Sequence, residues 1–241
     1  MSREVVIQVT NLYKKFGSFT ANDNLNFEVY KGEIFGFLGA NGAGKTTAMR
    51  ILCGLSSPTS GTVIVAGHDV KRYPERVKRQ IGYMSQRFSL YEDLTVWENM
   101  RLYAGIYGLS GGAFRQRAKE LLEDLNFYGQ RNELISNLSL GWKQKLAFTV
   151  ALIHVPAIVF LDEPTGGVDP VTRRQFWEMI YRAAHQGTTI FVTTHYMDEA
   201  EYCDRVSIMA EGRIKALDTP KELKRRYNAQ SMNDVFVALV R

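Results

Sequence analysis

The fold of this chain is decided by one stretch, which reads Gly39-Ala40-Asn41-Gly42-Ala43-Gly44-Lys45-Thr46. It fits the pattern GxxxxGK[ST] of a phosphate-binding P-loop. A short apolar run over residues 34–38 precedes it and predicts a buried strand, and a helical pattern follows it over residues 47–53. Strand, glycine loop and helix, in this order, is the arrangement that binding of a nucleotide phosphate requires.

The chemistry of the loop gives each part a role. Glycines let the backbone curl so that its N–H groups point inward, and the helix N-terminus adds a partial positive charge. Lys45 can reach the β- and γ-phosphates, and the hydroxyl of Thr46 can ligate Mg²⁺. The alternative is a glycine-rich turn that binds nothing. The predicted nucleotide-binding residues here are Gly39, Ala40, Asn41, Gly42, Ala43, Gly44, Lys45, Thr46 and Thr47.

Composition limits the class of protein. The 241 residues are 45% hydrophobic and 23% charged, with a net charge of +5, as is ordinary for a globular protein with a substantial core. The longest mostly apolar window, residues 148–161, is too short to cross a bilayer, and no apolar signal follows the first three residues. We expect a soluble, cytoplasmic chain with reduced thiols at Cys53 and Cys203. The dispersed basic residues favour a solvated surface over a nucleic-acid site.

The order of predicted elements indicates an α/β fold. Strands are expected at 5–9, 25–29, 63–65 and 81–84, and helices at 95–107, 113–125 and 139–154. Strands at 157–161, 188–192, 206–209 and 213–217 then alternate with helices after Pro170, near 197–202, after Pro220 and at 232–240. The pattern predicts one domain, 1–241, with a mostly parallel sheet, a β-rich N-terminal part and an all-helical insert at about 88–155.

Two carboxylates follow a buried strand, at Asp162 and Glu163. Ligands of open α/β sheets bind at the carboxyl ends of the strands, so Asp162 is placed to hold Mg²⁺. Glu163 is the best candidate to polarise an attacking water. The alternative is a solvated turn, which the nearby P-loop makes the weaker interpretation.

A third element is the helix start at Ser139 and Gly141. A small hydroxyl and exposed amides at a helix N-terminus can bind an anion. Most N-cap serines only cap their helix, so this motif alone is weak.

Together these three elements resemble the nucleotide-binding domain of ABC transporters, over essentially the full chain. The resemblance implies an ABC ATPase cassette with a RecA-like P-loop NTPase core and ATP and Mg²⁺ as cofactors. The P-loop corresponds to Walker A, residues 159–165 to Walker B and residues 138–142 to the LSGGQ signature. Further matches are Gln86 (the Q-loop glutamine), residues 167–169 (the D-loop), His195 (the switch histidine) and Phe16 (the aromatic that stacks on adenine).

Two positions depart from the family pattern. Leu140 stands where the signature usually has Gly, and Trp142 where it usually has Gln. Ser139 and Gly141 remain, and these are the positions expected to meet the γ-phosphate. Trp142 is expected to pack or to lie at an interface. The signature sequence at residues 138–142 and the tail at residues 231–236 resemble those of ATPases of the ABC-2 exporter branch.

The resemblance also implies a mechanism. Two cassettes pair head to tail, and each ATP lies between Walker A of one and the signature of the other. Gln86 would ligate Mg²⁺, contact the water and link the site to a membrane partner, and His195 would hold the γ-phosphate. The alternatives are a surface polar residue for Gln86, a core histidine for His195 and a core aromatic for Phe16.

The leading hypothesis is therefore the ATP-hydrolysing subunit of an exporter, on the cytoplasmic face of a membrane. An integral membrane permease would dock around residues 86–97, where 87–91 place aromatic and apolar residues in a loop; alternatively Phe88 and Leu90 close the domain's own core. The competing hypothesis is a soluble ABC ATPase associated with nucleic acid or the ribosome. Such proteins usually carry two cassettes or a long coiled coil, so no nucleic-acid partner is expected.

Overall fold

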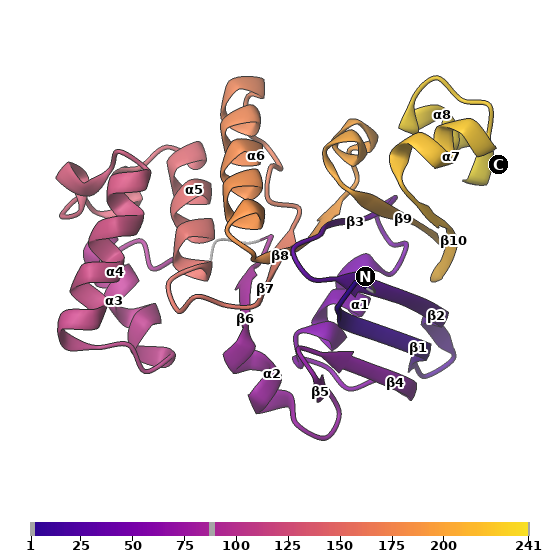
Figure 1. Ribbon diagram of the computed structural model, residues 1–241, viewed down its shortest axis with the longest axis horizontal. Helices are drawn as coiled ribbons and strands as arrows, with labels where there is room; N and C mark the ends of the chain where they lie inside the picture. Colours follow the sequence, from indigo (N-terminus) through magenta and orange to yellow (C-terminus); the bar gives the residue numbers. More distant parts are fainter. Residues whose placement is uncertain (1–2, 87–89, 241) are drawn as a thin grey trace.

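The computed structural model describes residues 3–86 and 90–240 (Figure 1). Its strands form two sheets, one with the order β10-β9-β3-β8-β7-β6 and one with the order β2-β1-β4-β5. Helices α3, α4 and α5 lie together at one end of the molecule, and α7 and α8 lie at the other (Figure 1). This confirms the predicted P-loop NTPase type of α/β fold.

The six-stranded sheet positions the site. Every residue of β3, β7 and β8 is buried, which explains the continuous apolar runs in β3 and β7. All neighbouring strands pair in parallel except β10 with β9. Leu38 pairs with Thr194 and Asp162 with Thr193, so the carboxyl ends of β3, β7 and β8 share one edge. The strands are Ile34–Gly39 (β3), Ile81–Met84 (β6), Ile158–Asp162 (β7), Thr189–Thr194 (β8), Arg205–Ala210 (β9) and Arg213–Asp218 (β10).

The N-terminal sheet is antiparallel and packs on the first through aromatic side chains. The ring of Phe27 lies 5.8 Å from that of Phe35 in β3. Its first two strands are longer than predicted, because the pairing of β1 with β2 continues through register shifts around Leu12 and Lys14 that break the alternation. The strands are Val5–Phe16 (β1), Phe19–Tyr30 (β2), Ser60–Val65 (β4) and His68–Asp69 (β5).

The predicted helices form in the expected order, and α2 is an additional helix that the sequence did not predict. The sequence Thr95-Val96-Trp97-Glu98 predicts a capping box, which is confirmed by reciprocal hydrogen bonds between Thr95 and Glu98. Asp169 caps α6 ahead of Pro170. The helices are Lys45–Leu52 (α1), Pro74–Gln80 (α2), Val96–Ile106 (α3), Gly111–Asp124 (α4), Leu140–Ala151 (α5), Pro170–His185 (α6), Pro220–Arg226 (α7) and Met232–Val240 (α8), with 3₁₀ turns at Tyr128–Gln130 (η1), Ile135–Asn137 (η2) and Met197–Tyr202 (η3).

Several local expectations were wrong. Helix α5 ends at Ala151 rather than His154, because Pro156 cannot continue a helix and restricts Val155 before it. Ser139 occupies the N-cap position of α5 but makes no side-chain cap hydrogen bond. The sequence Thr219-Pro220-Lys221-Glu222 also predicts a capping box, but only half of it forms. The hydroxyl of Thr219 accepts from the backbone N–H of Glu222, whose carboxylate pairs with Arg225 instead.

None of the helices in residues 3–86 and 90–240 is long and apolar enough to cross a membrane.

Candidate nucleotide-binding site

The P-loop connects the end of β3 to the start of α1, as the sequence predicted. Gly44 has a φ of +98°, and a Cβ at this position would lie 2.3 Å from the backbone oxygen of Ala21 in β2. Asn22 also donates a hydrogen bond of 3.0 Å to the backbone oxygen of Gly44. Only glycine fits such a backbone and such a close approach, so β2 fixes the shape of the loop.

Lys45 lies at the centre of the site. Its side chain is 5% exposed, and its Nζ donates to the backbone oxygens of Gly39 at 2.7 Å and of Ala40 at 3.1 Å. The same Nζ lies 3.8 Å from Oε1 of Glu163. Burial lowers the pKa of Lys45, while the charges of Glu163 and Asp162 act in the opposite direction. The ammonium group is therefore enclosed between the loop and the two carboxylates at the end of β7.

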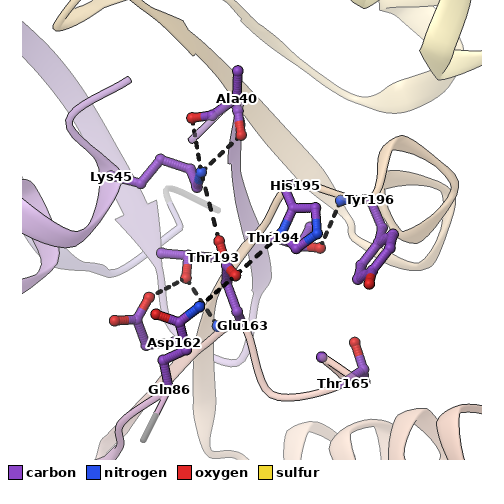
Figure 2. A network of polar contacts seen from close by, with 12 residues as sticks. Ala40, Lys45, Gln86, Asp162, Glu163, Thr165, Thr193, Thr194, His195 and Tyr196 are labelled. Atoms are coloured by element: carbon purple, nitrogen blue, oxygen red, sulfur yellow. Dashed lines mark hydrogen bonds and ion pairs between the residues drawn. The ribbon is translucent and has the colours of Figure 1, made fainter. Parts of the chain in front are cut away.

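Three predicted residues converge on the carboxylate of Glu163 (Figure 2). Nε2 of Gln86 donates to Oε2 of Glu163 at 2.9 Å, and Nδ1 of His195 lies 3.1 Å from the same oxygen. The backbone of Glu163 has a φ of +48°, which is uncommon outside glycine. Its N–H donates to the backbone oxygen and the hydroxyl of Thr193, both at 3.1 Å. These bonds to β8 hold the side chain toward Lys45, Gln86 and His195.

Asp162 lies beneath this cluster at the end of β7. It is 3% exposed and accepts a hydrogen bond of 2.6 Å from the hydroxyl of Thr193. Burial raises the pKa of Asp162, and the negative charge of Glu163 acts in the same direction. A neighbouring cation would favour the ionised form.

The P-loop and Glu163 line a cavity of about 460 Å³. Six predicted nucleotide-binding residues line it, together with Gln86 and Glu163; Gly39, Ala40, Ala43, Asp162 and His195 lie outside its lining. The lining residues are Phe19, Ala21, Asn41, Gly42, Gly44, Lys45, Thr46, Thr47, Gln86 and Glu163.

The aromatic side of the cavity includes a residue that was not predicted. Phe16 was expected to stack on adenine, yet it is 54% exposed, with Nζ of Lys14 4.8 Å from its ring centre, and it does not line the cavity. Phe19, its pairing partner across the β1–β2 hairpin, does line it. Sequence reasoning missed Phe19 and Ala21; their place directly after the hairpin turn was the available signal.

Ser139 and Gly141 do not line this cavity. A Cβ on Gly141 would lie 2.6 Å from Cγ2 of Thr172 in α6, so the start of α5 packs closely on the helix after the D-loop. The ring of Trp142 stacks on Phe127 at 4.2 Å, which is the packing role expected of it. Leu140 is 40% exposed.

The residues predicted to hold Mg²⁺ fit that ion. Thr46 and Gln86 both line the cavity, and the carboxyl of Asp162 precedes Glu163. These groups offer a hydroxyl, an amide and a carboxylate oxygen, the hard ligands that Mg²⁺ prefers, and Mg²⁺ usually takes its remaining ligands from phosphates and water. Among the described residues no group of three His, Cys, Asp or Glu side chains forms a separate metal cluster.

Comparison with known proteins decides the family. The family model described as "ABC transporter" matches residues 22–166, which include the P-loop and both carboxylates. The chain belongs to the ABC transporter family. It is an ATP-binding cassette, and ATP hydrolysis coupled to transport is the reaction characteristic of this family.

Similar proteins cover all or most of the cassette. A "Probable multidrug ABC transporter ATP-binding protein" of Escherichia coli is 48% identical over 231 residues, which are 96% of this chain and 39% of that protein. The solved structure of an ATP-binding subunit of an ABC transporter is 30% identical, covers 97% of this chain and 99% of its own, and has a TM-score of 0.87. The dimeric post-hydrolysis cassette MJ0796, bound to ADP and Pi, is 27% identical over 88% of this chain and 98% of its own, with a TM-score of 0.79. The cassette thus spans well under half of its Escherichia coli relative.

Proposed function

We propose that this chain is the ATP-binding and ATP-hydrolysing part of an ABC-2 type exporter, acting at the cytoplasmic face of a membrane through a separate membrane subunit. The observation that carries the proposal is the convergence of Gln86, His195 and Lys45 on the carboxylate of Glu163 beside the P-loop cavity. The Escherichia coli relative, named as a multidrug transporter protein, supports export as the direction.

The residues of the cavity have distinct parts in this proposal. The P-loop amides and Lys45 bind the β- and γ-phosphates, and the exposed ring of Phe16 stacks on adenine. Thr46, Gln86 and Asp162 hold Mg²⁺, which when bound neutralises charge on the phosphates. Glu163 orients the attacking water and accepts its proton, while His195 contacts the γ-phosphate.

The signature residues act on a second cassette. Ser139 and Gly141 stand at the N-terminus of a twelve-residue helix and do not line the cavity of their own chain. A helix N-terminus favours an anion, and a head-to-tail partner would supply one from its P-loop. That the similar cassette MJ0796 is described as a dimer with ADP and Pi supports this arrangement.

The membrane subunit docks on a groove between the sheets and the helical insert. The groove measures about 380 Å³ and includes Leu55, Tyr83, Ile106 and Tyr107 in its lining. Ile106 is 68% exposed and Leu55 48%. Within the surface expected from sequence, Tyr91 is 52% exposed, whereas Leu90 is buried in the core and cannot bind a partner; residues 87–89 lie outside the described residues.

The test is ATP hydrolysis by the purified chain together with co-purification from membranes. We expect Mg²⁺-dependent hydrolysis that Glu163→Gln slows on the order of 10²–10⁴-fold, and recovery of the chain with an integral membrane protein. Recovery with RNA instead, or hydrolysis that is indifferent to Glu163→Gln, would refute the proposal.

A further inference from the structure

A fully buried carboxylate lies behind the site, at Glu199. It is 0% exposed and belongs to η3, four residues after His195. Its Oε1 accepts a hydrogen bond from the hydroxyl of Thr165, and its Oε2 has no hydrogen-bond partner in the described part of the chain. A carboxylate in such a position is costly to bury unless it has specific partners. The groups that face Glu199 therefore decide whether its burial serves a role other than packing.

The cation that faces Glu199 is Arg173, in the first turn of α6. Its Nε lies 3.7 Å from Oε1 of Glu199, and its Nη1 lies 3.6 Å from Oδ2 of Asp198. The guanidinium carbon also lies 4.5 Å from the ring centre of Tyr196, the residue directly after His195. One side chain of α6 thus contacts three of the four residues that follow His195.

Thr165 ties the same segment to the chain that carries Glu163. Thr165 lies two residues after Glu163, so its bond to Glu199 joins the segment after β7 to the segment after β8. Nearer the cavity, the same two segments meet where Nδ1 of His195 lies 3.1 Å from Oε2 of Glu163. The segment that carries His195 therefore meets the segment that carries Glu163 at two places, one inside the site and one behind it.

We call the contacts of Thr165 and Arg173 with Glu199 the anchor. The anchor is also linked to α5, the helix that begins in the signature motif. Nε2 of Gln144 in α5 donates to the backbone oxygen of Gly166, the residue after Thr165. The start of α5 packs on Thr172, directly before Arg173. Displacement of α5 or of the start of α6 would consequently reach the residues that hold His195.

We propose that Arg173, Glu199 and Thr165 are positioning residues that fix His195 against Glu163 for ATP hydrolysis. The inference rests on the proposed role of His195 and adds the three residues through which its position is set. None of them lines the nucleotide cavity, so their loss should affect turnover rather than nucleotide affinity. A misplacement of about 1 Å in a catalytic group can cost on the order of 10²-fold in rate.

The test is a double-mutant cycle on ATP hydrolysis by the full chain. Thr165→Val removes the hydroxyl at nearly constant volume, and Thr165→Ser keeps it. Each is measured with His195 intact and with His195→Ala. Arg173→Met is compared with the control Arg174→Met. Arg174 is the next residue on α6, its side chain is 85% exposed, and its Nε lies 3.4 Å from Oε1 of Glu178 rather than near Glu199. The readouts are kcat, KM, the Kd of a fluorescent ATP analogue and the melting temperature.

We expect Thr165→Val and Arg173→Met to lower kcat about tenfold or more with little change in Kd. Thr165→Ser should restore most of the rate, and Arg174→Met should match the wild type. In the His195→Ala background, Thr165→Val should have almost no further effect, because the group that it positions is gone. Thr165→Val remains informative if Arg173→Met fails to fold.

Two results would overturn the inference separately from the proposed function. Equal slowing by Thr165→Val in both backgrounds would show that it does not act through His195. A wild-type kcat for Thr165→Val would show that the anchor stabilises the fold but does not position His195 for hydrolysis. If His195→Ala itself does not slow hydrolysis, the role of His195 is refuted and the inference with it.

Discussion

Nε2 of Gln86 donates a hydrogen bond of 2.9 Å to Oε2 of Glu163, although the two residues are 77 positions apart. Glu163 directly follows β7, whereas Gln86 lies two residues after the end of β6, in the connection to the helical insert. The contact therefore joins the carboxylate proposed to orient water to the segment that leads toward the proposed docking surface. A change at the γ-phosphate that moves Glu163 would also move the start of that connection.

Lys45→Ala should remove most ATP binding. The change deletes the charge that pairs with the β- and γ-phosphates, and charge-assisted hydrogen bonds of this kind are worth about 1.5–3 kcal/mol each. Titration with a fluorescent ATP analogue measures the effect, with Lys71→Ala on the exposed surface as the control. An unchanged affinity for Lys45→Ala would refute the assignment of the P-loop.

The sequence predicts the parts of the site that carry a strong local pattern. Buried strands β3 and β7 show continuous apolar runs, and the P-loop and the pair Asp162–Glu163 begin at their last residues. Helix α2 was missed because its seven residues, Pro74–Gln80, are polar except for Val77. Glu199 was missed because a glutamate in an acidic segment is typical of a solvated turn, and its burial depends on Arg173 and Thr165, which are distant in sequence.

Cysteines placed on the proposed docking surface should cross-link to a co-expressed membrane subunit. Ile106→Cys and Tyr91→Cys put a thiol at exposed positions, while the native Cys53 and Cys203 are buried and burial raises the pKa of both thiols. The native cysteines should therefore stay unreactive. Lys221→Cys, in α7 at the other end of the molecule (Figure 1), is the control. Cross-linking from Lys221→Cys alone would place the partner elsewhere.

His154 should make the folded chain sensitive to acid. Burial lowers the pKa of His154 from 6.5 to about 4, and its ring stacks on Tyr107 at 3.5 Å. At a pH between 4 and 6.5, His154 is protonated in the unfolded chain but neutral in the folded chain. The stability that comes from neutral, buried His154 is therefore lost as pH falls from about 6.5 to about 4. After solvent screening is allowed for, we expect about 1–2 kcal/mol.

Denaturant unfolding at pH 7 and at pH 4.5 measures this loss. His154→Gln should lose less stability between the two pH values than the wild type does. His185→Gln, at an exposed histidine on α6, should behave as the wild type. Equal acid sensitivity in His154→Gln and the wild type would contradict the assignment.

Glu163→Gln should also allow the paired cassettes to accumulate. With ATP bound and hydrolysis slowed, the nucleotide bridges the P-loop of one chain and Ser139 of the other, and the neutral side chain no longer repels the γ-phosphate. Light scattering should show a monomer without nucleotide and a dimer at saturating ATP. Ser139→Glu in the same background should prevent pairing, because it places a negative charge against the phosphate. A monomer under both conditions would count against the shared site.

The central claim is that Glu163 orients the water that attacks ATP. The most direct measurement is the rate of ATP hydrolysis by Glu163→Gln and by the wild type, at saturating Mg²⁺ and ATP, with binding checked by the fluorescent analogue. Because Lys45, Thr46 and Asp162 are intact, the variant should bind ATP as the wild type does, and its kcat should fall on the order of 10²–10⁴-fold. Hydrolysis by Glu163→Gln at the wild-type rate would contradict the account.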